Sequence, residues 1–345
     1  AGTYIVAFWI TLVNVLIYNH LFINNFSKQE LKLMLITTIL IIGFGWTKIH
    51  TPRNQDNTTE LSIAVIQPNL DPNEKWDKST RELTFNIMDS LHRKAIDLDP
   101  DIILFPETAL PAYLRINNRV RQQLQNIVDQ SNIPILIGTV DRRFDNKGKK
   151  LFYNSSMFIC PNKDYLMYDK IHLVPFAEYD LMPSLLHPLG ELNLNIDRGV
   201  FMPGENYTIF DYNGVRFSNL ICYESTLPHY ARRFVKNGAE FLMIQANDGW
   251  LGQSAGPYQH FEHARLRAIE NRVTVIRSGN TGISGVILPN GKIKKKVSLG
   301  RQAIFKESIV LGEPGSIYSK YGDVFSSICF VIFLFLSFVV SCLKK

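Results

Sequence analysis

The chain has 345 residues, of which 46% are hydrophobic, and carries a formal net charge of +6. Such a chain can build one large core and still supply membrane segments. Its densest basic run, residues 292–296, is interpreted as a solvated hairpin end, with contact to anionic lipid head groups as the alternative. Because no nucleic-acid-binding motif accompanies this charge, the sequence argues against a nucleic-acid partner.

The four cysteines, Cys160, Cys222, Cys329 and Cys342, do not suggest a disulfide framework, since two of them fall in an apolar C-terminal run. No pair has the spacing of a zinc site. We therefore expect neither a metal nor another cofactor. The sequence begins with Ala1, which fits either a fragment or a processed protein.

Three apolar runs are long enough to cross a bilayer. They cover residues 3–23, residues 31–46 with an extension to 49, and residues 324–343. The predicted organisation is two transmembrane helices in 1–49, a polar linker in 50–60, a large domain in 61–315 and a last transmembrane helix in 324–343. For the two N-terminal runs, the alternative is that one or both are buried core helices.

Basic residues at the ends of these runs predict their orientation. Lys28 and Lys32 lie between the first two runs, and Lys344 and Lys345 follow the last one. The positive-inside rule puts both pairs in the cytoplasm. The large domain then lies on the outer side of the membrane, which is the periplasm in a bacterium with two membranes.

Strand and helix patterns alternate along the large domain, as in an α/β layered fold. Strands are expected at 61–66, 101–105, 134–140, 155–160, 215–221, 240–245, 273–278 and 285–288. Helices are expected at 78–98, 117–131, 227–237 and 259–271.

Side chains with complementary chemistry follow these strands. Glu107 and Cys222 each come just after a strand, and Lys170 lies in a loop. Since sites in open α/β layers form at the carboxyl ends of strands, we expect the three to act together. They supply a thiol nucleophile, a carboxylate to accept its proton and an ammonium group to stabilise an oxyanion. The alternatives are a buried structural cysteine, a capping carboxylate and a solvated lysine.

The neighbours of these residues refine the hypothesis. A helix N-terminus after Cys222 would favour the thiolate, and Lys170 would pair with Glu107 at rest. Glu178 would orient Lys170 or assist proton transfer. His172, which is followed by apolar residues, is predicted to be a packed, hydrogen-bonded histidine rather than a catalytic one.

Several separated motifs share this order with one family. They are FPETALP (105–111), YDK (168–170), VPFAE (174–178), ICYE (221–224), NDGWLG (247–252) and GPYQHF (256–261). The set resembles the nitrilase, or carbon–nitrogen hydrolase, superfamily with its Glu-Lys-Cys triad. Within it, the chain is most similar to the membrane branch of apolipoprotein N-acyltransferases.

The resemblance implies an α/β fold of the nitrilase type, an αββα sandwich flanked by transmembrane helices, at the periplasmic face of the bacterial inner membrane. Cys222 would take a fatty acyl chain from a phospholipid, typically phosphatidylethanolamine, as a thioester. The α-amine of the diacylglyceryl-cysteine at the N-terminus of an apolipoprotein would then accept the chain, in the last step of lipoprotein maturation.

The resemblance also assigns roles to residues. Glu107 is the expected general base, and Lys170 is expected to steady the tetrahedral intermediate. Trp250 would lie on a mobile loop lining lipid access. The expected supporting residues are Glu178, Tyr223, Glu224 and Trp76. Because the family has more membrane helices ahead of its catalytic domain, the chain resembles the C-terminal part of a longer protein.

Two alternative functions are compatible with the sequence, and one apolar segment has two possible roles. A membrane-tethered amidase would use the same triad on small amides, with water as the second acceptor. A membrane-anchored scaffold on a retired fold would have a thiol of ordinary reactivity. The apolar residues Leu181, Met182, Leu185 and Leu186 are expected either to form a lid that dips into lipid or to pack against the domain.

Overall fold

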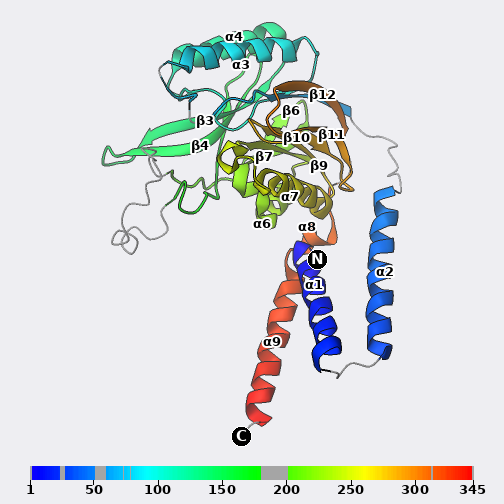
Figure 1. Ribbon diagram of the computed structural model, residues 1–345. Helices are drawn as coiled ribbons and strands as arrows, with labels where there is room; N and C mark the ends of the chain where they lie inside the picture. The colour runs from blue at the N-terminus through cyan, green and yellow to red at the C-terminus, as the bar shows by residue number, and fades with distance from the viewer. Residues whose placement is uncertain are drawn as a thin grey trace.

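The computed structural model describes residues 2–23, 28–50, 60–72, 74–77, 79–179, 201–311 and 314–343. Most of these residues form a layered domain, and helices from both ends of the chain project from it on one side (Figure 1). Most of the expected linker and the four residues of the expected lid lie outside the described residues.

Two six-stranded mixed sheets form the centre of the domain, with strand orders β12-β1-β2-β3-β4-β5 and β11-β10-β9-β8-β7-β6. Pairs β1–β2, β2–β3, β7–β8 and β8–β9 are parallel, and the remaining pairs are antiparallel. The first sheet contains β1 (Glu60–Gln67), β2 (Ile102–Leu104), β3 (Ile135–Phe144), β4 (Lys150–Ile159), β5 (Leu166–Asp169) and β12 (Ala303–Val310). The second contains β6 (Phe210–Tyr212), β7 (Val215–Ile221), β8 (Phe241–Ala246), β9 (Thr274–Gly279), β10 (Ser284–Ile287) and β11 (Ile293–Val297).

Helices cover the outer faces of the two sheets (Figure 1). The first sheet is covered by α3 (Arg81–Ile96) and α4 (Asn118–Ser131), and the second by α6 (Pro228–Lys236) and α7 (Gly256–Asn271). Met88 of α3 and Val128 of α4 share a buried cluster with Ile103 of β2. Phe234 of α6 and Phe261 of α7 belong to the cluster that fills the space between the sheets and under these helices. The order helix, sheet, sheet, helix confirms the predicted αββα sandwich.

The alternation of side chains along β1 shows how one strand serves two cores. Ile63 and Val65 belong to the cluster between the sheets, whereas Ala64 and Ile66 belong to the cluster under α3 and α4. Successive strand residues point to opposite faces, so a strand buried on both faces must be apolar throughout.

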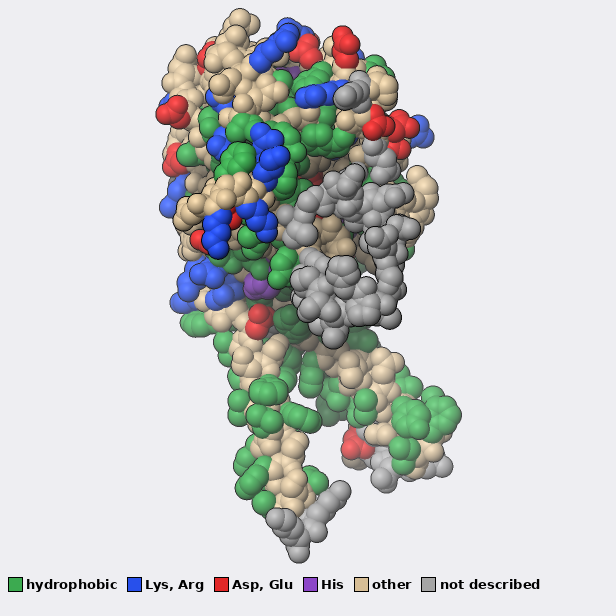
Figure 2. All heavy atoms as spheres, turned by 90° about the vertical axis from the view of Figure 1, so that its left-hand side faces the viewer, with side chains coloured by type: hydrophobic (Ala, Val, Ile, Leu, Met, Phe, Trp, Pro, Cys, Tyr) green, Lys and Arg blue, Asp and Glu red, His purple; other side chains and the backbone are tan. Residues whose placement is uncertain are grey.

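Among the described residues, three helices outside the sandwich are long and apolar enough to cross a membrane. They are α1 (Gly2–Tyr18), which continues as a π-helical turn (Asn19–Ile23), α2 (Lys28–His50) and α9 (Val324–Leu343). Phe8 of α1 and Phe325 of α9 pack edge to face at 5.4 Å between ring centroids, so these two helices lie side by side. Figure 2 shows hydrophobic side chains on the projecting helices and most charged ones on the domain.

Among the described residues, three further short elements flank the sandwich. The 3-10 turns η3 (Cys222–Thr226) and η4 (Asp248–Leu251) follow β7 and β8, and α8 (Ile317–Tyr321) precedes α9. The turns begin at the carboxyl ends of neighbouring parallel strands, which is where sites form in α/β layers.

Candidate active site

Glu107 stands in the loop that follows β2. It is buried, and Asn154 of β4 donates a hydrogen bond of 2.8 Å to its Oε1. The loop lies so close to β3 that a Cβ added at Gly138 would meet the carbonyl oxygen of Pro106 at 2.5 Å. Glycine at this position therefore allows the close approach that brings Glu107 into the site.

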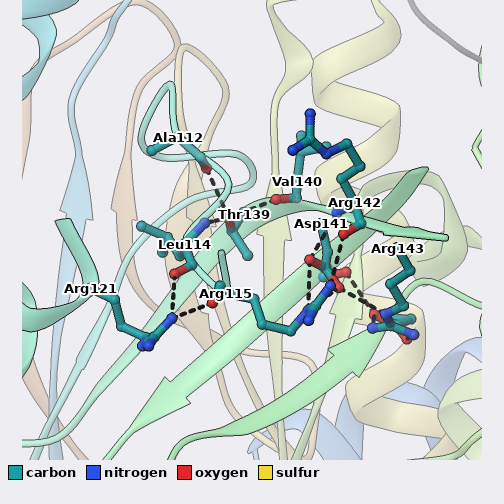
Figure 3. A network of polar contacts seen from close by, with 11 residues as sticks. Ala112, Leu114, Arg115, Arg121, Thr139, Val140, Asp141, Arg142 and Arg143 are labelled. Atoms are coloured by element: carbon teal, nitrogen blue, oxygen red, sulfur yellow. Dashed lines mark hydrogen bonds and ion pairs between the residues drawn. The ribbon is translucent and has the colours of Figure 1, made fainter. Parts of the chain in front are cut away.

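A network of guanidinium and carboxylate groups holds the rest of this loop (Figure 3). Arg115 Nε donates to both carboxylate oxygens of buried Asp141, at 2.9 and 2.8 Å. Arg143 Nε reaches Asp141 at 2.8 Å, and its Nη1 lies 2.8 Å from Asp169 Oδ2. The loop after β2 and the end of β5 are therefore fixed to the same strand, β3.

Lys170 directly follows β5 and its side chain is completely buried. Its Nζ donates a 2.6 Å hydrogen bond to Glu178 Oε2, and Asn154 Nδ2 reaches Glu178 Oε1 at 2.9 Å. Asn154 thus bridges the carboxylates of Glu107 and Glu178. The prediction that Lys170 pairs with Glu107 at rest is wrong in detail, because Glu178 accepts its hydrogen bond.

The charge of Lys170 is secured by these carboxylates. Burial opposes a charged lysine, but the attraction of Glu178 and then of Glu107 outweighs it and raises the pKa of Lys170 above its usual value. In the same way, Lys170 overcomes the effect of burial on Glu178 and lowers the pKa of that carboxyl. The site therefore holds a permanent ammonium group.

Cys222 opens the turn η3 with φ at +51°, in the left-handed region. A non-glycine residue held there costs on the order of 1–3 kcal/mol, and such strain is concentrated at functional sites. Burial raises the pKa of the thiol well above its usual value, Glu107 raises it further, and Lys170 lowers it. These influences favour a protonated thiol at rest, whereas a helix N-terminus alone would favour the thiolate.

Glu224 is fully buried and clamps the ends of β5 and β7 together. Its carboxylate accepts hydrogen bonds from the hydroxyl of Tyr168 at 2.7 Å and from the backbone amides of Ile171 at 2.9 Å and Ile221 at 3.1 Å. Burial raises the pKa of Glu224, although these hydrogen bonds oppose the shift. Glu224 thus holds together the segments that carry the lysine and the cysteine.

The other expected site residues lie nearer the surface. The Tyr223 ring lies 5.7 Å from His172, whose Nδ1 is 3.1 Å from the hydroxyl of Tyr230, so His172 is packed and hydrogen-bonded as predicted. Trp76 lines a surface cavity of about 530 Å³. Trp250 lies in η4 with 52% of its surface exposed.

Sequence reasoning missed side chains that only the fold brings to the site. Asn154 lies within a strand whose sequence gives no sign of a bridge between carboxylates. Lys75 is buried, and its Nζ donates to the backbone oxygen and Oγ1 of Thr108 at 2.6 and 2.7 Å, next to Glu107. A lysine in a polar loop is normally interpreted as solvated, so its burial had no local signal.

Cys222, Asp248 and His260 place possible metal-ligand atoms within 4.8 Å of one another. Both carboxylate oxygens of Asp248 are already engaged: Oδ2 accepts a hydrogen bond from Arg277, and Oδ1 lies against Nδ1 of His260, each at 2.7 Å. The guanidinium of Arg277 also repels a second cation at this distance. We therefore interpret the cluster as a hydrogen-bonded network rather than a metal site.

The assembled groups suit covalent acyl chemistry. The charges of Glu107 and Lys170 both act on the Cys222 thiol, so the three side chains share one site. A nucleophile, a proton acceptor and a fixed cation are the elements needed to form and break a tetrahedral intermediate.

Residues 62–313 match the sequence profile of the carbon-nitrogen hydrolase family. The chain therefore belongs to the carbon–nitrogen hydrolase family.

Curated relatives narrow this assignment to one branch. A protein from Geobacter metallireducens is 34% identical over 95% of this chain and 63% of its own length. One from Chlorobaculum tepidum is 30% identical over 100% of this chain and 69% of its own length. Both are named apolipoprotein N-acyltransferase, which confirms the resemblance read from the motifs. The apolar helices and this branch mark the chain as a membrane protein.

The chain spans 63% of the length of the Geobacter relative, and a third relative with the same name, from Rickettsia typhi, is 31% identical over 93% of this chain and 64% of its own length. The activity, substrates and partners of the whole protein are therefore matters for proposal.

Solved structures confirm the fold. A double mutant of the amidase from Nesterenkonia sp. AN1 in complex with acrylamide has a TM-score of 0.56 at 16% identity, covering 79% of this chain and 95% of that one. A carbon-nitrogen hydrolase from Helicobacter pylori G27 has a TM-score of 0.56 at 15% identity, covering 72% and 89%. At such identities the likeness establishes the αββα architecture alone.

Proposed function

We propose that the protein transfers a fatty acyl chain from a phospholipid, through a thioester on Cys222, to the α-amine of a diacylglyceryl-cysteine at the N-terminus of an apolipoprotein. The observation that carries the proposal is a partly buried thiol acted on by a carboxylate and a fixed ammonium group, in a domain with apolar helices projecting beside it. The names of the curated relatives support the choice of substrates.

The first half-reaction forms the thioester. Glu107 accepts the proton of Cys222 as the sulfur attacks the ester carbonyl of the phospholipid. The tetrahedral intermediate then breaks its carbon–oxygen bond, and Glu107 returns the proton to the departing oxygen. The products are the acyl-enzyme and a lysophospholipid, with no net gain or loss of protons.

The second half-reaction discharges the thioester. The amine of the lipoprotein cysteine attacks the acyl carbon, and Glu107 accepts a proton from its nitrogen. The carbon–sulfur bond breaks, the sulfur recovers the proton, and an amide is released. In both intermediates the negative charge lies on the former carbonyl oxygen, where the ammonium of Lys170 would stabilise it.

The other proposed residues support these steps. Glu178 keeps Lys170 charged and fixed through its 2.6 Å contact, and Glu224 holds the backbone on either side of the reacting groups. Tyr223, Trp76 and Trp250 are exposed enough to contact a substrate. We assign the catalytic domain to residues 61–315.

The proposed location follows from charge and length. Lys28 and Lys32 at one end of α2 and Lys344 and Lys345 after α9 mark the cytoplasmic side. The domain then faces the periplasm at the inner membrane, within reach of phosphatidylethanolamine as donor. Transfer at this surface would complete lipoprotein maturation.

The competing function is an amidase that passes the acyl group to water. Purified protein in detergent would be given phosphatidylethanolamine with a diacylglyceryl-cysteine peptide, or small amides alone. Our proposal predicts lysophospholipid and N-acylated peptide in equal amounts. Ammonia from amides, without lysophospholipid, would support the amidase instead.

A further inference from the structure

The backbone carbonyl of Cys222 is held by side chains from its own turn and from α7. Its carbonyl oxygen accepts a 2.7 Å hydrogen bond from the hydroxyl of Ser225, within the same turn, and lies 3.0 Å from His260 Nε2 of α7. His260 Nε2 is also 3.1 Å from Ser225 Oγ. Thus a buried imidazole contacts the peptide unit of the proposed nucleophile, and it takes no part in the two proposed half-reactions.

The acceptor chemistry assigns the hydrogen at Nε2. A carbonyl oxygen can only accept, so the contact with Cys222 requires His260 to donate from Nε2. The hydroxyl hydrogen of Ser225 points to the same carbonyl, which leaves its oxygen as an acceptor for Nε2 as well. His260 therefore faces the turn as a donor and not as a base for the thiol.

A buried ion pair fixes the other edge of the ring. His260 Nδ1 lies 2.7 Å from Asp248 Oδ1, and the second oxygen of Asp248 accepts a 2.7 Å hydrogen bond from Arg277, whose Nη2 is also 3.0 Å from Nδ1. Arg277 Nε donates to the backbone oxygen of Ile283 at 3.0 Å. A Cβ added at Gly282 would collide with the Asp248 carboxylate, so the backbone also confines it.

This network crosses the carboxyl edge of the second sheet. Cys222 follows β7, Asp248 follows β8, and Arg277 lies on β9, the third of these adjacent parallel strands. His260 comes from the helix that packs over them. The three strands therefore hold Cys222, Asp248 and Arg277 in place. His260 connects Asp248 to the carbonyl of Cys222.

We propose that His260 is a positioning residue: its Nε2–H holds the carbonyl of Cys222, keeps this residue in the left-handed conformation and so directs the thiol toward Glu107 and Lys170. The assignment rests on the proposed role of Cys222. Without the hydrogen bond, the turn would relax toward ordinary backbone angles, and the sulfur would move away from the groups that take its proton.

The test compares His260→Phe, which keeps a ring without a donor, with His260→Gln, which keeps a donor. His263→Gln, on the same helix, is the matched control. Two rates are measured for each protein at equal folded fraction: single-turnover acylation by phosphatidylethanolamine and alkylation of Cys222 by iodoacetamide, followed on its peptide by mass spectrometry. Melting temperature reports the cost to folding.

Misplacement of a reacting group by about 1 Å costs about 100-fold in rate, so we expect His260→Phe to slow acylation by about that factor with an unchanged KM for the donor. His260→Gln should recover to within about tenfold of the parent, because a donor remains. His263→Gln should match the parent. A merely structural role would lower the melting temperature without changing the rate per folded molecule.

Equal acylation rates for His260→Phe and the parent would overturn the inference. So would a His260→Gln variant as slow as His260→Phe at unchanged stability. If phosphatidylethanolamine acylates no variant, including the parent, the proposed function fails, and the alkylation rates still decide the role of His260. Equal alkylation of parent and His260→Phe would then reject it.

Discussion

The proton of Cys222 governs the chemistry at the scale of single residues. Burial and Glu107 raise the pKa of the thiol, and Lys170 only partly compensates. The neutral thiol therefore predominates at rest, and the sulfur becomes a strong nucleophile only as Glu107 takes its proton. Such a thiol is shielded from adventitious oxidation or alkylation while it waits for substrate.

Glu107→Gln separates the role of Glu107 as a base from the effect of its charge on the thiol pKa. Loss of the base should lower the rate of acylation by about 10²–10⁴-fold. The same change removes a negative charge that raises the thiol pKa, so alkylation of Cys222 by iodoacetamide should begin at lower pH than in the parent. The measurement is a pair of rate profiles against pH for the two reactions.

Glu82→Gln, an exposed carboxylate on α3, is the control for Glu107→Gln and should change neither profile. An acylation rate for Glu107→Gln equal to that of the parent would contradict the assignment of Glu107 as base.

Glu178 makes stability depend on pH in the acid range. Its folded pKa is lowered, so its contribution is present above its unfolded value of about 4.3 and is lost as the pH falls through the folded value. Glu178→Gln should remove this part of the acid dependence of the free energy of unfolding. Chemical denaturation at several pH values measures it.

The exposed pair of Asp89 and Arg93 serves as the control, with side chains 46% and 64% exposed. Asp89→Asn should leave the acid dependence almost unchanged, because exposed pairs contribute little. An identical acid dependence for Glu178→Gln and the parent would mean that the buried pair with Lys170 is not formed in solution.

At the scale of elements, the apolar strands inside the sheets were predictable and the edge strands were not. The strands around residues 61–66 and 215–221 appear as β1 and β7, because burial on both faces leaves a continuous apolar run. The strands β5, β6, β11 and β12 were missed. All four lie at sheet edges; β5, β6 and β11 have five residues or fewer, and β11 contains most of the basic run and pairs antiparallel with β10. Lysines on an edge strand discourage pairing with another chain.

The same contrast holds for the candidate site. Glu107 and Cys222 could be found because a polar residue interrupts an apolar pattern at a strand end. Asn154 and His260 could not, since a strand asparagine and a helix histidine have no local signal, and their roles arise when distant elements meet. The hydrogen-bond partner of Lys170 could not be predicted either, because sequence spacing does not show whether Glu107 or Glu178 lies nearer to its ammonium group.

Glu224 shows how one side chain joins two elements. Glu224→Ala would leave the hydroxyl of Tyr168 and the amides of Ile171 and Ile221 without this acceptor. Each such buried donor costs about 1–3 kcal/mol, so we expect a loss of at least that size in the free energy of unfolding. Thermal and denaturant unfolding measure it. Glu240 is a partly exposed carboxylate in the loop before β8, so Glu240→Ala should cost less. Equal costs would contradict the role of Glu224 in joining β5 and β7.

At the scale of the whole molecule, α7 connects the site with the projecting helices. Arg267 Nη1 donates to the backbone oxygen of Thr226 in η3 at 2.7 Å and forms a buried ion pair of 2.8 Å with Glu270. Glu270 Oε1 in turn accepts a 3.1 Å hydrogen bond from the amide of Thr3 in α1. The turn of Cys222 is therefore linked to an apolar helix through one ion pair.

Glu270→Ala tests this link. It would leave the buried guanidinium of Arg267 without its counterion, and breaking such a pair typically costs about 3–5 kcal/mol. A lower melting temperature and faster proteolysis near η3 are expected. Glu262→Ala removes the acid of an exposed pair on the same helix, with Arg265, and should have little effect. Equal effects of the two substitutions would contradict the link.

The formation of an acyl adduct on Cys222 is the most direct test of the proposed acyl transfer. The detergent-solubilised protein and Cys222→Ala would be incubated with phosphatidylethanolamine, and their intact masses compared. Our account predicts a hydroxylamine-labile fatty acyl adduct on the parent alone, which a diacylglyceryl-cysteine peptide then removes. An adduct of equal yield on Cys222→Ala, or a folded parent that forms none, would contradict it.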